Sequence, residues 1–164
     1  PQGIEGSNPS PSAHMSRFTM VVAVHLFLLQ KQKVLLARRF NTGYEDGKFS
    51  LPAGHVEANE SCLAAMVREA KEEINILIQP HDLQLAHVMH RTTDRESIDF
   101  FFSCKIWEGQ PEINEKEKCD CLQWSDPQKL PTNTIPYIRQ AITLFQQGQP
   151  YSQMGWEGEA KKLS

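Results

Sequence analysis

The chain has 164 residues, enough for one domain with a hydrophobic core, and its 40% hydrophobic content is ordinary for a globular protein. The formal net charge of −3 argues against general nucleic-acid binding, but it permits a nucleotide substrate because metal ions can supply positive charge. No apolar run approaches the length of a membrane span, and the four cysteines include no C-x-x-C pair. We therefore expect a cytoplasmic protein with reduced thiols, monomeric or homodimeric, whose partner is a small molecule rather than nucleic acid or a membrane.

The predicted elements belong to one domain. Segment 1–14 lacks the apolar core of a signal peptide and is expected to be an expression-tag remnant, whereas the polar segment 150–164 is expected to be a flexible C-terminal tail. The domain then spans 15–149. Apolar and β-branched runs predict strands at 18–29, 34–40, 48–51, 83–91, 97–107 and 121–124. Together with two helices, these strands predict an α/β sandwich with a mixed β-sheet.

Both predicted helices carry an apolar stripe. The second is expected to begin near Thr134 as its N-cap, with Pro136 in the first turn, and to end at Gly148. The first spans 61–74, and at about 100° per residue its buried stripe is predicted to consist of Leu63, Met66, Val67, Ala70 and Ile74.

A different face of the first helix is acidic. Glu69, Glu72 and Glu73 lie three and four residues apart, where like charges cost roughly 0.2–0.5 kcal/mol per pair. A cluster of carboxylate oxygens suits a hard cation such as Mg²⁺ or Mn²⁺. The alternative is a solvated helix face on which Arg68 pairs with Glu72 at i, i+4.

The residues around this helix decide between the two interpretations. Segment 54–76 resembles the Nudix box, G-x5-E-x7-R-E-U-x-E-E-x-G-U, in which U is a bulky apolar residue. Asn75 stands where the family has glycine, but Asn tolerates the left-handed conformation and can end the helix in the same way. The resemblance implies a Nudix α/β/α sandwich over about 15–147. The matching positions are Gly54, Glu60, Arg68, Glu69, Glu72, Glu73 and Ile76, with a small Ala70 at the apolar position.

Nudix hydrolases hold divalent metals against a diphosphate, and water attacks phosphorus to cut the pyrophosphate linkage. By position, the resemblance implies that Glu69, Glu72 and Glu73 are metal ligands. It also implies that the carbonyl of Ala53 is a ligand and that Arg68 orients a glutamate.

A further carboxylate from a later loop often joins family sites as metal ligand or general base. Glu117 is our first candidate and Glu115 the second, because both precede the strand at 121–124. The alternative is a solvated acidic loop in which Lys116 and Lys118 are the partners of these glutamates.

Substrate-binding candidates lie in three places. Segment 131–136 resembles the part of MutT-type proteins that offers an Asn to a purine edge, which selects Asn133, although Asn133 is equally suited to cap the second helix. Arg38, Arg39 and Asn41 are expected near a phosphate or base, but alternation along a strand allows only one of the two arginines to face a pocket. His55 follows the box glycine and is expected to contact phosphate.

The leading hypothesis is a MutT-like, Mg²⁺-dependent (or Mn²⁺-dependent) pyrophosphohydrolase that converts a nucleoside triphosphate, standard or oxidised, to monophosphate and pyrophosphate. One alternative is hydrolysis of another nucleoside-diphosphate-linked compound, such as a nucleotide sugar. The other is a non-catalytic Nudix ligand-binding module. Such modules usually lose box glutamates, and this chain retains Glu69, Glu72 and Glu73.

Overall fold

The computed structural model describes residues 18–93 and 95–156, so the predicted expression-tag segment lies outside the described residues. Strand β1 (Val21–Gln30) begins the fold, and the box helix is α1 (Cys62–Ile74). The remaining elements are β2 (Lys33–Arg39), β3 (Phe49–Ser50), β4 (Ala53–His55), a 3-10 helix η1 (Pro80–Asp82), β5 (Gln84–Thr92), β6 (Glu96–Cys104), β7 (Cys119–Ser125), α2 (Pro136–Gln146) and β8 (Tyr151–Met154).

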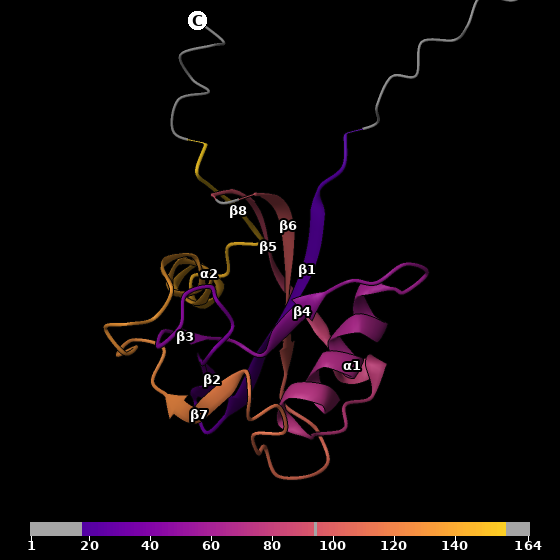
Figure 1. The fold of residues 1–164 in the computed structure, drawn as a ribbon, viewed down its shortest axis with the longest axis vertical. Coiled ribbons are helices and arrows are strands. Elements are labelled where there is room, and N and C mark those ends of the chain that lie inside the picture. The colour runs from indigo at the N-terminus through magenta and orange to yellow at the C-terminus, as the bar shows by residue number, and fades with distance from the viewer. Residues whose placement is uncertain (1–17, 94, 157–164) are drawn as a thin grey trace, which may run out of the picture.

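The eight strands form one sheet with the order β3-β2-β1-β6-β5-β8, in which β4 also pairs with β1 and β7 with β2. The pairs β1–β6 and β5–β8 are parallel and the others are antiparallel, so the sheet is mixed. Helices α1 and α2 lie on opposite faces of the central strands (Figure 1). Each helix encloses its own apolar core against the sheet. The predicted α/β/α sandwich is confirmed.

The first two strands separate soon after their hairpin, and this separation positions the site. Strands β1 and β2 pair only at Leu29–Val34 and Gln30–Lys33, around a tight turn in which both central residues have positive φ. Beyond this point β1 pairs with β4, whereas β2 pairs with β3 and β7. Beyond the hairpin, β1 and β2 therefore diverge like a fork, with no backbone hydrogen bonds between them.

Helix α1 has the termini that the sequence predicts. The Ser61 hydroxyl accepts a hydrogen bond from the backbone N–H of Ala64 at 3.1 Å, and Asn75 adopts φ 53° with its N–H directed to helix carbonyls. The predicted apolar stripe needs one correction, because Leu63 is 38% exposed. The buried line runs instead through Ala65, Met66, Ala70 and Ile74, where two alanines allow close approach to the neighbouring strands β1 and β4.

The C-terminal part differs from prediction in two respects. Ile135 rather than Thr134 precedes α2, because the Thr134 hydroxyl donates to the Pro131 carbonyl at 2.8 Å and is buried there. Segment 150–164 is predicted to be a flexible tail. Within it, Tyr151–Met154 instead form strand β8 beside β5. The indole N–H of Trp156 then donates to the His90 carbonyl at 3.2 Å. Among the described residues, no helix is long and apolar enough to cross a membrane.

Candidate active site

A cavity of about 350 Å³ occupies the fork between β1 and β2. Its wall includes residues from β1, β2, β3, β4 and β7, together with the side of α1 that carries the box glutamates. Both signs of charge face it: the acidic residues are Glu69, Glu73, Asp99 and Glu115, and the basic ones are Arg38, Arg39, Arg91, Arg95 and Lys118.

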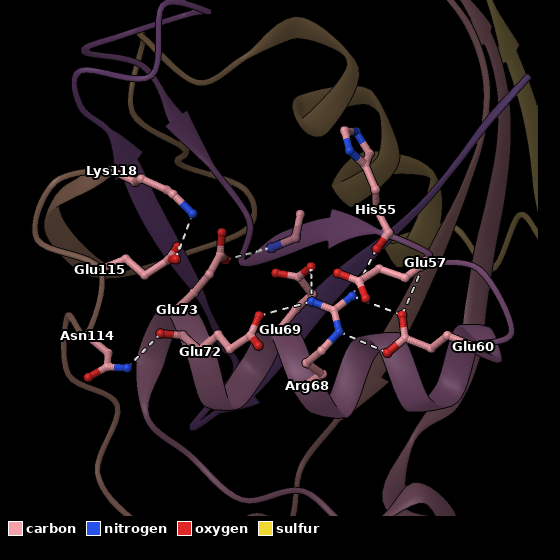
Figure 2. A network of polar contacts seen from close by, with 11 residues as sticks. His55, Glu57, Glu60, Arg68, Glu69, Glu72, Glu73, Asn114, Glu115 and Lys118 are labelled. Atoms are coloured by element: carbon pink, nitrogen blue, oxygen red, sulfur yellow. Dashed lines mark hydrogen bonds and ion pairs between the residues drawn. The ribbon is translucent and has the colours of Figure 1, made fainter.

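Arg68 is the cation that lies among the box glutamates (Figure 2). Its guanidinium donates to both oxygens of Glu60 at 2.9 and 3.0 Å, to Glu69 at 2.7 Å and to Glu72 at 3.0 Å, and also to the His55 carbonyl at 3.0 Å. The hydrogen bond that Arg68 donates to Glu60, together with those it donates to Glu69 and Glu72, raises the pKa of Arg68 although burial opposes this. Arg68 does not line the cavity, and its predicted role in orienting a glutamate stays a prediction.

Gly54 makes room for the Glu69 carboxylate. A β-carbon at position 54 would lie 1.8 Å from Oε1 of Glu69, so any side chain there would force the carboxylate to move. Burial raises the pKa of Glu69, and the hydrogen bond from Arg68 partly offsets this. The absence of a side chain at Gly54 thus allows the half-buried Glu69 carboxylate to lie against the backbone of β4.

Glu73 lies at the cavity, where Oε2 accepts a hydrogen bond from the backbone N–H of Ala53 at 2.8 Å. Burial raises the pKa of Glu73 to about 8, while the Ala53 hydrogen bond lowers it. Ala53 therefore already contacts a box glutamate through its N–H, and the metal-binding role of its carbonyl stays a prediction.

Glu72 is the most accessible of the three, with a side chain that is 51% exposed and bound to Arg68. The i, i+4 pair weighed as the alternative to a metal site is thus present. Within the described residues, no three His, Cys, Asp or Glu side chains are arranged to hold a metal ion. The donor set is nevertheless all oxygen, which suits a hard divalent cation. Arg68 contacts one oxygen of Glu69 and one of Glu72, so each carboxylate keeps a second oxygen with which it could bind such a cation.

Of the two candidate glutamates in the later loop, Glu115 lines the cavity and Glu117 does not, and the role of either as metal ligand or general base stays a prediction. Asn114 anchors this loop to the end of α1, because its N–H donates to the Glu73 carbonyl at 3.0 Å and its side-chain amide to the Glu72 carbonyl at 2.8 Å. Glu115 follows this anchor, lines the cavity and accepts a hydrogen bond from Lys118 at 2.7 Å. Glu117 is exposed and does not line the cavity.

Both arginines of β2 line the cavity, contrary to the expectation that only one would. The register of β2 against β7 shifts between Arg38 and Arg39, and this irregularity breaks the alternation of side chains. Arg38 pairs with Asp120 at 2.7 Å, and Arg39 donates to the Tyr44 carbonyl at 2.7 Å. Both guanidinium groups are thus oriented by neighbours.

Of the other substrate-binding candidates, His55 lines the cavity, whereas Asn41 and Asn133 do not. The Nε2 of His55 is 2.7 Å from a guanidinium nitrogen of Arg95. Burial and the charge of Arg95 lower the pKa of His55. The Asn133 side chain donates to the Gly47 carbonyl at 2.7 Å and so contacts the loop between β2 and β3; it does not cap α2, and its role in reading a base stays a prediction.

A family model described as NUDIX domain matches residues 19–145. The chain belongs to the Nudix family. Phosphatase NudJ from Escherichia coli K12 and that from Shigella sonnei are each 28% identical over 103 residues, covering 61% of this chain and 67% of theirs. A MutT Nudix hydrolase from Burkholderia pseudomallei has the same fold with a TM-score of 0.70 at 22% identity, covering 75% of this chain and 95% of its own. A Nudix hydrolase from Nitrosomonas europaea gives 0.69 at 24% identity, with 81% and 93% covered.

This Nudix-type hydrolase also contains a buried polar group that the sequence analysis missed. We call His25, Arg91, Asp99 and Tyr137 the Asp99 cluster; all four line the cavity. Asp99 is fully buried and accepts hydrogen bonds from Nε of Arg91 at 2.9 Å and from the Ser97 hydroxyl at 3.1 Å. The sequence contained a signal for this cluster, because Arg91 and Asp99 occupy positions in β5 and β6 that alternate with less buried ones and therefore point into the protein. Arg95, in the turn between β5 and β6, had no comparable signal.

Proposed function

We propose that this Nudix hydrolase is a Mg²⁺-dependent pyrophosphohydrolase, also active with Mn²⁺, that converts a nucleoside triphosphate to monophosphate and pyrophosphate. The observation that carries the proposal is the placement of Glu69, Glu73 and Glu115 in one cavity with several cationic side chains. Carboxylates beside cations suit a substrate whose polyphosphate is bound partly through metal and partly through protein.

The metal ligands proposed are Glu69, Glu72 and Glu73, with the Ala53 carbonyl completing the set. When bound, the cation neutralises phosphate oxygens and lowers the pKa of a coordinated water. Arg68 makes a bidentate contact with Glu60 and contacts one oxygen each of Glu69 and Glu72, so the helix has an internal counter-charge while the other oxygens remain for the cation.

The protein's own cations complete phosphate binding. Arg39 and Lys118 line the cavity, and both are held by neighbours that leave donors available for an anion. Glu115 is placed to accept the proton of the attacking water, because it lies at the cavity beside Lys118 and at the end of α1. His55 contributes a phosphate contact at the cavity edge.

A substrate panel tests the proposal. Standard and oxidised nucleoside triphosphates and nucleotide sugars are incubated with the protein and Mg²⁺, then with Mn²⁺, and the products are identified. We expect monophosphate and pyrophosphate from a triphosphate. Monophosphate together with a phosphorylated sugar would instead indicate a nucleotide-sugar hydrolase. No product from any compound would refute the catalytic proposal and favour a ligand-binding module.

Glu72→Gln isolates the contribution of the box. The side chain is exposed, so the fold should persist, while loss of a charged metal ligand should reduce kcat at least about a hundredfold. Glu108→Gln is the matched control, because Glu108 is exposed and does not line the cavity. Equal activity of the two variants would remove Glu72 from the mechanism.

A further inference from the structure

The Asp99 cluster lies at one end of the apolar core beneath α2. His25, Asp99 and Arg91 point to the face of the sheet that α2 covers. Two residues away on the same face of each strand are the buried side chains Phe27, Phe101 and Met89. The change from apolar to charged side chains occurs in three adjacent strands, β1, β6 and β5, at the point where the cavity begins. This coincidence suggests that the polar groups are there to contact a ligand in the cavity.

Burying these charges is expensive for folding alone. Asp99 is 0% exposed and Arg91 4%, and a buried ion pair is often no more stabilising than well-packed apolar residues of similar volume. Perturbed ionisable groups that line a cleft are candidates for function. The Asp99 cluster shares its cavity with Glu69 and Glu73, so a ligand whose phosphates face the glutamates can place another part against the cluster.

One nitrogen of the cluster has no hydrogen-bond partner. Nε2 of His25 lies 3.4 Å from Asp99 Oδ1, and since an ionised carboxylate only accepts, this nitrogen carries the hydrogen. In a ring with a single N–H, Nδ1 is then an acceptor. Among the described residues it is the single buried side-chain nitrogen or oxygen left unpaired, and the His25 side chain is 4% exposed. Such an atom calls for a donor from outside the protein.

The surroundings of Nδ1 suit a flat ring. The His25 imidazole stacks on Phe101 at 4.6 Å, and the Tyr137 ring meets it edge-on at 5.9 Å. The Arg91 guanidinium lies 4.3 Å from the centre of the Tyr137 ring. Planar groups thus form this part of the wall, and a modest rotation of Tyr137 is the movement expected to uncover Nδ1. Stacking surfaces with one specific acceptor are typical of nucleobase recognition.

We propose that the Asp99 cluster is the recognition site for the nucleobase of the substrate, with an N–H group of the base donating to Nδ1 of His25. Asp99 and Arg91 act as positioning residues, because Asp99 fixes the tautomer of His25 and Arg91 packs on Tyr137. The inference rests on the proposed function for the nucleotide character of the ligand. It does not require that the nucleotide be hydrolysed.

Binding of reaction products without metal separates the two proposals. Calorimetry compares AMP, GMP, CMP and UMP with ribose 5-phosphate, which has the sugar and phosphate but no base. We expect at least one nucleotide to bind the wild-type protein about tenfold more tightly than ribose 5-phosphate. If none does, the inference fails. A base preference in a protein that cleaves no triphosphate would support the recognition site and refute the proposed reaction.

His25→Gln keeps a donor to Asp99 but takes the acceptor away from the position of Nδ1, because the amide nitrogen can replace Nε2 whereas the amide oxygen branches from the end of the side chain. We expect nucleotide affinity to fall about tenfold, to the level of ribose 5-phosphate, whose own affinity stays unchanged. His81→Gln is the matched control, since His81 is 79% exposed in η1. Equal loss for nucleotide and ribose 5-phosphate would overturn the assignment.

A measurement on the wild-type protein covers the case in which His25→Gln does not fold. With ¹⁵N-labelled histidine, the preferred nucleotide should shift the Nδ1 resonance of His25, as expected when a lone pair accepts a hydrogen bond. Ribose 5-phosphate should leave it in place. An unchanged Nδ1 resonance at saturating nucleotide would overturn the proposed contact.

Discussion

The box helix and the Asp99 cluster share one cavity, yet the pKa values of their buried carboxylates move in opposite directions. In the box, burial raises the pKa of Glu69 and Glu73 despite hydrogen bonds that oppose it. In the cluster, burial would likewise raise the pKa of Asp99, but the contacts with His25 and Arg91 lower it well below its usual range. The cluster carboxylate is satisfied by protein, whereas the box carboxylates are satisfied only in part.

The two ends of the cavity therefore lack different groups, because the box lacks positive charge and the Asp99 cluster lacks one hydrogen-bond donor. Arg68 forms ion pairs with Glu60, Glu69 and Glu72. One positive charge faces three negative ones, so the excess negative charge favours binding of a cation. In the cluster the charges balance, and the unmet group is the neutral acceptor Nδ1 of His25. We therefore expect box substitutions to affect turnover and cluster substitutions to affect stability and base preference.

The largest effect is expected from Asp99→Ala. It leaves Arg91 buried without its carboxylate, and breaking a buried pair in this way costs about 3–5 kcal/mol. For a chain of this size the melting temperature should fall by roughly 6–20 °C. Urea denaturation and calorimetry measure the change. Asp120→Ala is the control, because Asp120 pairs with Arg38 at the surface and its loss should change stability little.

Gly54→Ala should have the next largest effect, and on activity rather than stability. The new methyl group displaces the Glu69 carboxylate, and a misplacement of about 1 Å can cost about a hundredfold in rate. Steady-state kinetics should show a lower kcat while the melting temperature stays within a few degrees of the wild type. A variant with full activity would mean that Glu69 works equally well from another position.

The box could be predicted from sequence because its geometry is local. Helical spacing fixes where Glu69, Glu72 and Glu73 point, and Asn75 ends the helix in the left-handed conformation expected of it. The same local logic failed for Arg38 and Arg39, because a register shift against β7 breaks the alternation assumed for a regular strand. A shift of this kind depends on the partner strand, which single-strand periodicity does not contain.

The Asp99 cluster could not be assembled from sequence alone. His25 and Asp99 are 74 residues apart, and they meet because β1 and β6 pair in parallel, a pairing that neither segment encodes by itself. Strand β8 was missed for a related reason, since its four residues become a strand only beside β5. The choice of Glu115 over Glu117 likewise depends on Asn114 anchoring the loop to α1.

Glu115→Gln and Glu117→Gln sharpen the assignment at the box end of the cavity. We expect kcat to fall at least about tenfold for Glu115→Gln, because this carboxylate lines the cavity, and less than about twofold for Glu117→Gln, because that side chain is exposed. The two residues lie in the same loop, so each variant is the matched control for the other. A larger loss with Glu117→Gln would restore the original sequence-based choice.

The smallest effect is a pH dependence of stability that belongs to the cluster. Because the folded pKa of Asp99 is lowered, its charged contacts stabilise the protein fully above the unfolded value of about 3.9, and this contribution is lost as the pH falls through the folded pKa. One proton changes the unfolding free energy by at most about 1.4 kcal/mol per pH unit. The stability difference between wild type and Asp99→Asn, measured by urea denaturation, should therefore be constant from pH 7 to 5 and narrow below pH 4. His25, Arg91 and Ser97 face Asp99 and are the same in both proteins, so subtracting the two curves isolates this carboxylate. A difference that stays constant down to pH 2 would mean that folding does not lower the pKa of Asp99, and the contrast with the box carboxylates would disappear.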